Sequence, residues 1–473
     1  MSAIITENTE TGTGIRSDFM PRVLKGFGSC MPQQENPAVV VAVSGGSDSL
    51  ALLLLTRRYL QTYLPACRLI AVTVDHGLRA ESATEAAGVA EFCKNLNIPH
   101  QIMCWEGEKP ASGLAMAARN ARYDLLVQAA RACGAGMILT GHTADDQVET
   151  YLMRRERADV VTGLAGEGRG LAAMAMQTLL QDSVLLCRPL LSIWREELRD
   201  VLRTDNICWF DDPSNDNPTY ERPRIRQAAR TLDKPALLAA AEQAAEQRRA
   251  DNRKVVHLLT REDYPIERLA GDGLLLVAGW TENVGDAAPL MLGYLLATVG
   301  GQTYLPSMRD CSILADWLRS APASGKHRKT LHSCVVEKSV TGILIRRERR
   351  NLPVMLLHSS ERAVWDGRYT LSNEGTDDLV VAAVNENQLS GYLRGHQIES
   401  TQSERDMLLS APAIFRDGSL VEIPALSHLV PQASSMRMKR HVACFDRVLS
   451  GHDFEVAKAV KVLLTMPFNH IYR

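Results

Sequence analysis

The chain has 473 residues, of which 45% are hydrophobic and 23% charged, and its formal net charge is −2. This length exceeds one ordinary domain, so we expect two to four. The near-neutral charge excludes a globally basic nucleic-acid-binding protein. The ten cysteines form no C-x-x-C pair, which excludes a zinc knuckle or redox motif. We find no signal peptide and no run of eighteen apolar residues, and therefore expect a cytoplasmic protein without a membrane segment.

The first half of the sequence alternates strand and helix patterns. We expect strands at 39–43, 69–74, 100–104 and 137–140, separated by helices at 49–63, 82–96 and 112–133. This order predicts an α/β fold with a doubly wound parallel sheet, covered by helices on both faces. Ligands of such sheets bind beyond the carboxyl ends of the strands, so the residues that follow each strand are the candidates for function.

The turn after the first strand contains only serine, glycine and aspartate: Ser44, Gly45, Gly46, Ser47, Asp48 and Ser49. Its glycines let the backbone approach a ligand closely, and amides at a helix start favour an anion. Asp48 can hold a magnesium ion that bridges phosphate oxygens. The turn fits neither the Walker loop nor the Rossmann fingerprint, but resembles the SGGxDS signature of the PP-loop pyrophosphatases. We interpret it as a phosphate cradle, in preference to a turn that only caps a helix.

A second polar cluster follows the fourth strand, where His142 to Glu149 include three carboxylates and one imidazole. Asp145 and Asp146 lie at a helix start, and at least one of them could serve only as a cap. A lone histidine is also more often structural than catalytic. Beside a phosphate loop at the same sheet edge, however, the cluster predicts a metal-binding and proton-handling set.

The composition changes near residue 230. We expect a helix at 235–259, then helices at 290–299 and up to Leu318, strands at 330–337 and 342–347, and a strand-rich tail that includes 364–369. Four local basic runs favour a polyanionic partner, although each alone is typical of a solvated surface: 222–226, 326–329, 346–350 and 437–441. The domains that we expect are a disordered tail at 1–22, a catalytic domain at 23–230, a helical linker with a small α+β domain at 231–352, and a strand-rich domain at 353–473.

Several motifs together resemble the bacterial tRNA(Ile)-lysidine synthase family. These are SGGSDS at 44–49, VDHGLR at 74–79, AARNARY at 117–123, GHTADDQVET at 141–150, RPLL at 188–191, DPSN at 212–215 and the arginine-rich 220–226. The resemblance is dense from 39 to 226 and thinner to about 370. SGGxDS alone identifies only the PP-loop superfamily, of the adenine nucleotide alpha hydrolase-like fold, whereas the combination is more specific. The chain departs from the family at Thr143, usually histidine, at Pro223, and at 156–159, usually a Gly-rich loop.

The resemblance implies ATP-dependent ligation of L-lysine to carbon 2 of the wobble cytidine in the CAU anticodon of tRNA(Ile). The reaction would pass through an adenylated tRNA, release AMP and pyrophosphate, and change codon reading from AUG to AUA. ATP and magnesium are then required, tRNA(Ile) and L-lysine are the partners, and both C-terminal domains bind tRNA. The assembly state stays open, with a homodimer as one option.

The resemblance also implies roles for particular residues. The nucleotide would be bound by Ser44, Gly45, Gly46, Ser47, Asp48, Ser49, Asp75 and His76. The catalytic group would be Asp48, which also holds magnesium, Arg122 at the α-phosphate, and the pair His142 and Asp146. Asp146 would orient or deprotonate the lysine ammonium. Contacts to tRNA or phosphate would come from Arg119, Arg222, Arg224 and Arg226.

Three other functions stay open. A thiolase-like PP-loop enzyme would also modify tRNA, but sulfur transfer normally needs paired cysteines, which the chain lacks. A glutamine-dependent ligase needs an N-terminal cysteine nucleophile, which is absent. A non-catalytic ATP-sensing protein that binds RNA would tolerate the loss of Arg122 and Asp146, yet both residues are present.

Overall fold

The structure is a computed structural model that describes residues 17–31, 37–78, 81–162, 168–211, 221–280, 284–322 and 324–465. The chain divides into two compact units. The first comprises Met1–Arg249 with Val448–His452, and the second comprises Ala250–Arg447 with Asp453–Arg473. The predicted joins at 230 and 352 do not coincide with this division, which falls within the helix α8 (Lys234–Leu259).

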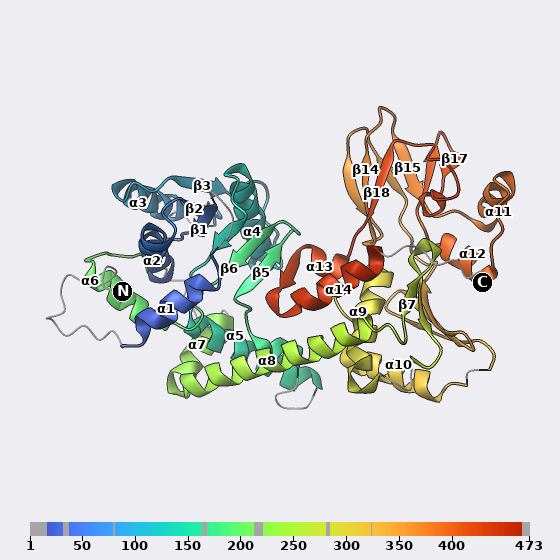
Figure 1. The fold of residues 1–473 in the computed structure, drawn as a ribbon. Helices are drawn as coiled ribbons and strands as arrows, with labels where there is room; N and C mark the ends of the chain where they lie inside the picture. Colours follow the sequence, from blue (N-terminus) through green and yellow to red (C-terminus); the bar gives the residue numbers. More distant parts are fainter. Residues whose placement is uncertain are drawn as a thin grey trace. The chain divides into compact units, whose positions relative to one another are not determined.

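The first unit carries the alternating strands and helices (Figure 1). Its elements are α1 (Phe19–Gly28), β1 (Ala38–Ala42), α2 (Ser47–Tyr63), β2 (Arg68–Asp75), α3 (Ser82–Asn95), β3 (His100–Cys104), α4 (Leu114–Ala132), β4 (Met137–Leu139), α5 (Ala144–Thr162), β5 (Gln177–Leu180), β6 (Val184–Cys187), α6 (Arg195–Thr204), α7 (Glu221–Ala228), the start of α8, and β19 (Val448–Ser450). Helix α1 begins inside the segment that the sequence predicts as a disordered tail, because Phe19 and Val23 are buried in the core.

One seven-stranded sheet forms the centre of this unit, in the order β19-β5-β6-β4-β1-β2-β3. The five strands from β6 to β3 are parallel, and four of them, β1 to β4, were predicted. The parallel β6 and the antiparallel β5 and β19 are additions that the sequence analysis did not predict. Alternate residues of β1 enter two different cores: Val39 and Val41 pack with α2 and α6, and Val40 packs with α4. Both faces of the sheet are therefore covered, which confirms the doubly wound class.

The second unit holds three smaller sheets, in the orders β7-β8-β11-β10-β9, β12-β15-β16-β17 and β13-β14-β18. Its strands are β7 (Ile266–Arg268), β8 (Leu274–Val277), β9 (His327–Leu331), β10 (Cys334–Ser339), β11 (Gly342–Arg347), β12 (Met355–Leu357), β13 (Arg362–Trp365), β14 (Tyr369–Asn373), β15 (Leu379–Ala382), β16 (Ala413–Arg416), β17 (Ser419–Glu422) and β18 (Met436–Arg440). Its helices include α9 (Ala288–Gly300), α10 (Met308–Ser320), α11 (Glu386–Gly395), α12 (Gln402–Leu408), α13 (Ala443–Asp446) and α14 (Phe454–Thr465).

Two segments predicted as strand or strand-rich are hairpins. The predicted strand 330–337 turns at His332 and Ser333, which both have positive φ values of 54° and 63°, so it divides into β9 and β10. In the predicted strand-rich tail, residues 364–369 turn at Asp366 and Gly367, between β13 and β14. Two successive residues with positive φ form the tight turn that joins antiparallel strands.

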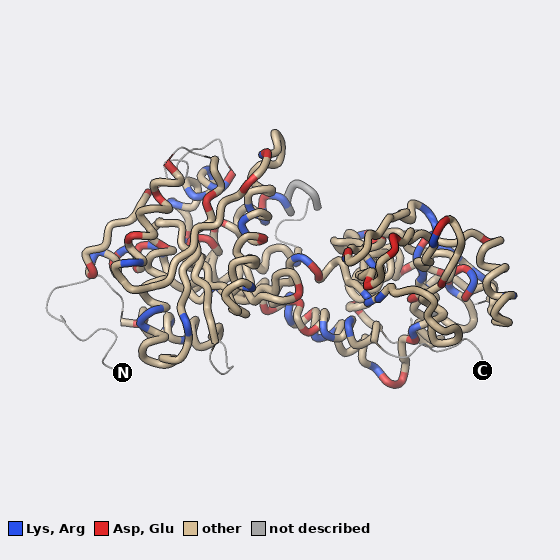
Figure 2. Tube along the Cα trace, turned by 90° about the horizontal axis from the view of Figure 1, so that it is seen from above, with Lys and Arg blue, Asp and Glu red and all other residues tan. Residues whose placement is uncertain are grey.

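Charged residues of both signs are interspersed along the chain (Figure 2), in keeping with the near-neutral net charge. Two of the basic runs that lie in the second unit, 346–350 and 437–441, are partly structural. Arg346 and Arg347 are buried and pair with Asp406 and Asp366 at 3.0 and 2.8 Å, and the half-buried Arg440 pairs with Asp272 at 3.4 Å. Arg346 and Arg347 are therefore not available to a polyanion. Among the helices in the described ranges, none has the length and apolarity needed to cross a bilayer.

Candidate active site

The serines of the loop after β1 form hydrogen bonds within the loop and with the start of α2. Ser49 Oγ donates to the Gly46 carbonyl at 3.0 Å and accepts from the Ser44 amide at 3.1 Å. Ser47 Oγ donates to Oδ1 of Asp48 at 3.2 Å. Gly46 is the N-cap of α2 and has no side chain to accept from the first amides of the helix, so the positive end of the helix is presented at the loop.

Two glycines allow this loop to form against its neighbours. Gly45 has a φ of +84°, and a Cβ built there would lie 2.8 Å from a ring carbon of Phe210. A Cβ on Gly141, which follows β4, would lie 2.8 Å from the Asp48 carbonyl oxygen. The loop after β4 therefore touches the backbone of the phosphate loop, and only glycine permits this approach.

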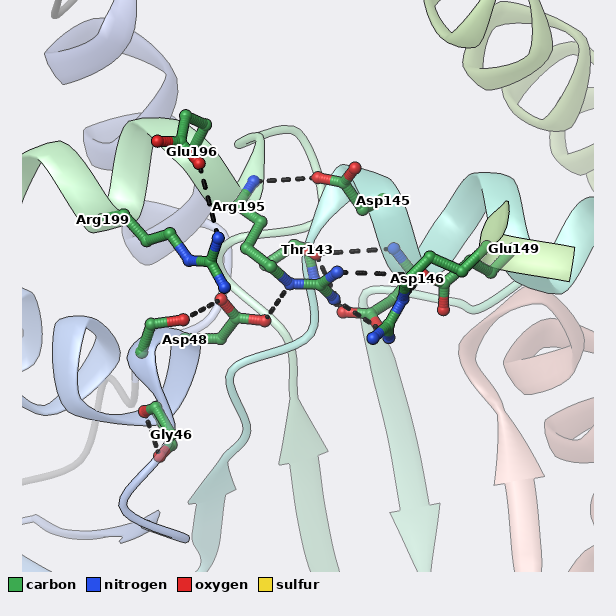
Figure 3. A network of polar contacts seen from close by, with 12 residues as sticks. Gly46, Asp48, Thr143, Asp145, Asp146, Glu149, Arg195, Glu196 and Arg199 are labelled. Atoms are coloured by element: carbon green, nitrogen blue, oxygen red, sulfur yellow. Dashed lines mark hydrogen bonds and ion pairs between the residues drawn. The ribbon is translucent and has the colours of Figure 1, made fainter. Parts of the chain in front are cut away.

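Arg195 joins the phosphate loop to the carboxylate cluster on α5 (Figure 3). Its Nε lies 2.9 Å from Oδ2 of Asp48, and its Nη2 lies 3.4 Å from Oδ1 of Asp146. Arg222 places Nη2 2.6 Å from the same Asp146 oxygen. The two aspartates are thus held by shared guanidinium groups, which offsets the cost of burying their charges.

Glu149 is the most buried acid of the cluster, at 2% exposure. Arg222 Nε lies 2.7 Å from its Oε2, and Arg226 Nε lies 2.7 Å from its Oε1. Each oxygen therefore has its own charge-assisted hydrogen bond. This carboxylate fixes the two arginines of α7 against α5.

Thr143 is the residue before α5 and forms a cap with Asp146. The Thr143 amide and Oγ1 donate to Oδ2 of Asp146 at 2.8 and 2.9 Å. The threonine that stands where the family usually has histidine is completely buried, and so has a structural role here. Asp146 therefore serves as a capping partner and also faces the arginine network.

The neighbouring Asp145 is bound elsewhere. The Arg195 amide donates to its Oδ2 at 2.9 Å, and Lys234 Nζ lies 2.9 Å from its Oδ1. Lys234 is the first residue of α8. Asp145 thus connects the starts of α6 and α8 to α5.

A cationic face lies beside this network. Arg122 on α4 is half-buried and makes no hydrogen bond or ion pair with the residues that the structure describes. Burial lowers its pKa, and Arg119 and Arg222 lower it further. His76, after β2, has a buried Nδ1 without a hydrogen-bond partner in the described ranges. Such unsatisfied polar groups are the ones that a bound anion would satisfy.

The ionisation states follow from these surroundings. Burial, with Arg188 next, lowers the pKa of His142 well below its usual value, so the imidazole is neutral at pH 7. Burial opposes ionisation of Asp146, but Arg222, together with Arg195, outweighs it and lowers the pKa of that carboxyl group. Burial raises the pKa of Asp48 more than Arg195 lowers it.

The remaining predicted residues are less central. Asp75 Oδ1 accepts from the Gly77 amide at 2.8 Å, so this carboxylate supports its own turn. Arg119 is exposed over the Tyr123 ring, and Arg224 is exposed beside Glu156 at 3.1 Å. His142 Nδ1 lies 2.9 Å from Thr140 Oγ1. Arg195 and Lys234 are central to the network, yet the sequence analysis did not single them out, and it included Glu149 only as one of the three carboxylates from His142 to Glu149.

Two departures from the family pattern have a simple structural outcome. Pro223 is the third residue of α7, where an amide would have no intrahelical acceptor, so its missing N–H costs little. Residues 156–159 continue the helix α5 to Thr162, and Arg157 pairs with Glu221 at 2.5 Å. The DPSN motif at 212–215, Arg79 and Tyr220 lie outside the described residues.

Comparisons with known proteins agree with this geometry. A sequence model of the PP-loop domain matches residues 20–231. The tRNA(Ile)-lysidine synthase of Brucella anthropi is 43% identical over 439 residues, which cover 90% of this chain and 94% of that protein. The synthase of Brucella suis biovar 1 is 42% identical over 433 residues, with the same coverage.

Solved structures are more distant. A U34-tRNA thiolase from Methanococcus maripaludis has 18% identity and a TM-score of 0.40, covering 52% of this chain and 88% of that chain. An NAD+ synthetase from Burkholderia pseudomallei has 14% identity and a TM-score of 0.26, covering 47% and 79%. Neither likeness adds to the identification, which depends on the sequence relatives.

The sheet, its serine-glycine loop and the matched domain define the first unit as a PP-loop ATP-binding domain. The relatives extend over nearly the whole chain, well beyond that domain. The chain belongs to the tRNA(Ile)-lysidine synthase family.

Proposed function

We propose that the protein ligates L-lysine to carbon 2 of the wobble cytidine in the CAU anticodon of tRNA(Ile), at the expense of ATP. One sheet edge presents both parts that this chemistry needs, a loop for the phosphates of ATP and a carboxylate cluster for an amine. This adjacency supports the proposal most directly. A cytoplasmic location and a homodimer remain predictions.

The first step is adenylation of the cytosine. Oxygen 2 of the base attacks the α-phosphorus of ATP, the bond to the bridging oxygen breaks, and pyrophosphate leaves. The loop from Ser44 to Ser49 binds the departing pyrophosphate through amides and hydroxyls. Arg122, which has no partner among the described residues, stabilises the charge that develops on the α-phosphate.

Magnesium fits this loop through one carboxylate. The described residues contain no cluster of three His, Cys, Asp or Glu side chains that could hold a metal, so the ion would depend on the ATP phosphates and Asp48. Magnesium is commonly bound in this way, and it would neutralise phosphate charge. Asp48 would then exchange part of its contact with Arg195 for the ion.

The second step is attack by the side-chain amine of lysine on carbon 2, with AMP as the leaving group. Asp146 attracts and orients the lysine ammonium. Its lowered pKa makes it a weak base, so orientation suits it better than deprotonation. His142 is neutral, and its Nε2 makes no hydrogen bond within the described ranges. This nitrogen can therefore take a hydrogen bond from the amine, while the lowered pKa makes His142, like Asp146, a weak base.

The tRNA contacts divide into two groups. Arg119 and Arg224 are exposed and available to phosphates of the tRNA. Arg222 and Arg226 are bound to the carboxylates, and they position the site. The second unit, as in the predicted organisation, contributes further tRNA binding.

Pyrophosphate release from ATP, measured with each substrate omitted in turn, tests the proposal. We expect release only with a CAU-anticodon isoleucine tRNA present, and transfer to a lysine adduct only when lysine is added. Sulfur incorporation into the tRNA would instead indicate a thiolase-like enzyme. ATP binding without any product would indicate the non-catalytic alternative.

A further inference from the structure

A cavity of about 400 Å³ opens on the far side of Arg195, among the starts of α5, α6 and α8 and the end of α7. Five cationic side chains line it: Arg195, Arg199, Arg226, Arg230 and Lys234. Two carboxylates, from Asp145 and Glu196, line it as well. Positive charge therefore exceeds negative charge in this cavity.

The five cationic side chains differ in how closely carboxylates bind them. Arg195, Arg226 and Lys234 are held by carboxylates at 2.7 to 2.9 Å. Within the described residues, the ion pairs of Arg199 are long, 3.6 Å to Glu196 and 3.6 Å to Asp211, and its guanidinium lies 5.8 Å from the Trp209 ring centroid. Arg230 is exposed and makes no hydrogen bond or ion pair within the part of the chain that the structure describes. Two guanidinium groups thus remain available for an anion.

The lining also includes Trp194, which is half-buried and packs partly against the core between α5 and α7. An aromatic side chain beside arginines is the usual combination for single-stranded nucleic acid, because the ring stacks and the cations bind the backbone. A cavity of this volume is much larger than one carboxylate group and can hold a phosphate with its sugar. Arg195 lines this cavity and also contacts Asp48 and Asp146, so the cavity adjoins the candidate active site.

We propose that this cavity binds a phosphodiester of the RNA substrate, next to the nucleotide that is modified, through Arg199 and Arg230. The proposal deepens the proposed function and rests on it. Trp194 would pack against the attached sugar or base. The cavity would hold the single-stranded loop while the target base lies at the phosphate loop.

The test uses the full-length protein and an unmodified RNA hairpin with a CAU loop, and compares wild type with Arg230→Gln. We expect binding to weaken about tenfold, as for one charged hydrogen bond. The slope of log affinity against log salt should become shallower by about 0.7, the value for one phosphate of a single strand. The KM for L-lysine should not change. Arg230→Lys should restore the salt slope, because it keeps the charge.

The matched control is Arg249→Gln, which removes an exposed arginine of α8 that pairs with Glu246 at 2.7 Å, outside the cavity. Unchanged hairpin binding by Arg230→Gln would overturn the proposal. A raised KM for lysine with unchanged RNA binding would also overturn it, and would assign the cavity to the carboxylate of the amino acid. Hairpin binding is measured without turnover. A wild-type protein that binds the hairpin but forms no adduct on tRNA(Ile) would therefore contradict the proposed function alone.

Discussion

Arg195 lies between Asp48 and Asp146, 147 and 49 residues away in the sequence, and contacts both carboxylates with one guanidinium group. The phosphate loop and the carboxylate cluster on α5 are therefore joined by a single side chain at the start of α6 (Figure 3). A planar guanidinium can serve two carboxylates at once, which an ammonium cannot do with the same geometry.

Arg195→Gln is expected to lower kcat/KM for ATP about a hundredfold, the effect of removing a well-placed charged donor. The kcat/KM of Arg195→Lys should lie between the values of Arg195→Gln and wild type. Initial rates of pyrophosphate release measure the effect. Arg203→Gln is the control, because Arg203 lies on the same helix and its ion pairs within the described residues are with exposed Glu196 and half-buried Asp200. Wild-type kcat/KM in Arg195→Gln would contradict this role.

Arg122→Gln should reduce the rate of adenylation about a hundredfold while leaving the melting temperature nearly unchanged. The guanidinium has no partner to lose among the described residues, so the folded state gives up no ion pair. Single-turnover pyrophosphate release separates adenylation from the later step. Arg131→Gln, near the end of the same helix and bound to Ser183, should behave as wild type. A large loss of stability without a loss of rate would refute the prediction.

Gly141→Ala should raise the KM for ATP and lower the free energy of unfolding by about 1–3 kcal/mol. The added methyl group would lie 2.8 Å from the Asp48 carbonyl oxygen, so the phosphate loop would have to move. Gly136→Ala is the control, since its Cβ would meet nothing within 4 Å. Chemical denaturation and ATP titration report the two effects, and equal behaviour of the two variants would count against the close approach.

Thr143→Ala should lower the free energy of unfolding by about 1 kcal/mol, the usual cost of losing a helix N-cap. Thr143→Ser should retain most of the wild-type free energy of unfolding, because the hydroxyl group that bonds to Asp146 is kept. Thr143→His, the residue usual in the family, should destabilise more, since the side chain is fully buried. Thermal unfolding ranks the three variants, and a stabilised histidine variant would be the contrary result.

Phe210→Ala should raise the KM for ATP about tenfold with little change in melting temperature. The Phe210 amide donates to the Gly45 carbonyl at 3.0 Å. The Phe210 side chain is 44% exposed, and its ring lies where a side chain on Gly45 would point. Loss of the ring would remove a contact that positions the phosphate loop, but it would leave no cavity in the hydrophobic core. Phe210→Tyr should restore the KM. An unchanged KM in Phe210→Ala would mean that the ring does not position the loop.

The sequence predicted the parts of the site that depend on local pattern. A β-branched run, two glycines and a following apolar helix are enough to place Ser44 to Ser49 at a sheet edge. Arg195 could not be predicted in this way, because its partners are distant in sequence and it looks like any helical arginine. The strand β19 could not be predicted either, because its three residues, 448–450, pair with β5, which is far away in the sequence. The turn at His332 and Ser333 lacks the glycine that usually marks a tight hairpin.

Mass spectrometry of nucleosides is the most direct test of the central claim. Unmodified isoleucine tRNA with a CAU anticodon is incubated with the protein, ATP, magnesium and L-lysine, then digested to nucleosides. We predict a cytidine that carries lysine, absent without ATP and strongly reduced with Asp146→Asn. A folded protein that releases pyrophosphate but leaves every cytidine without lysine would contradict the assignment.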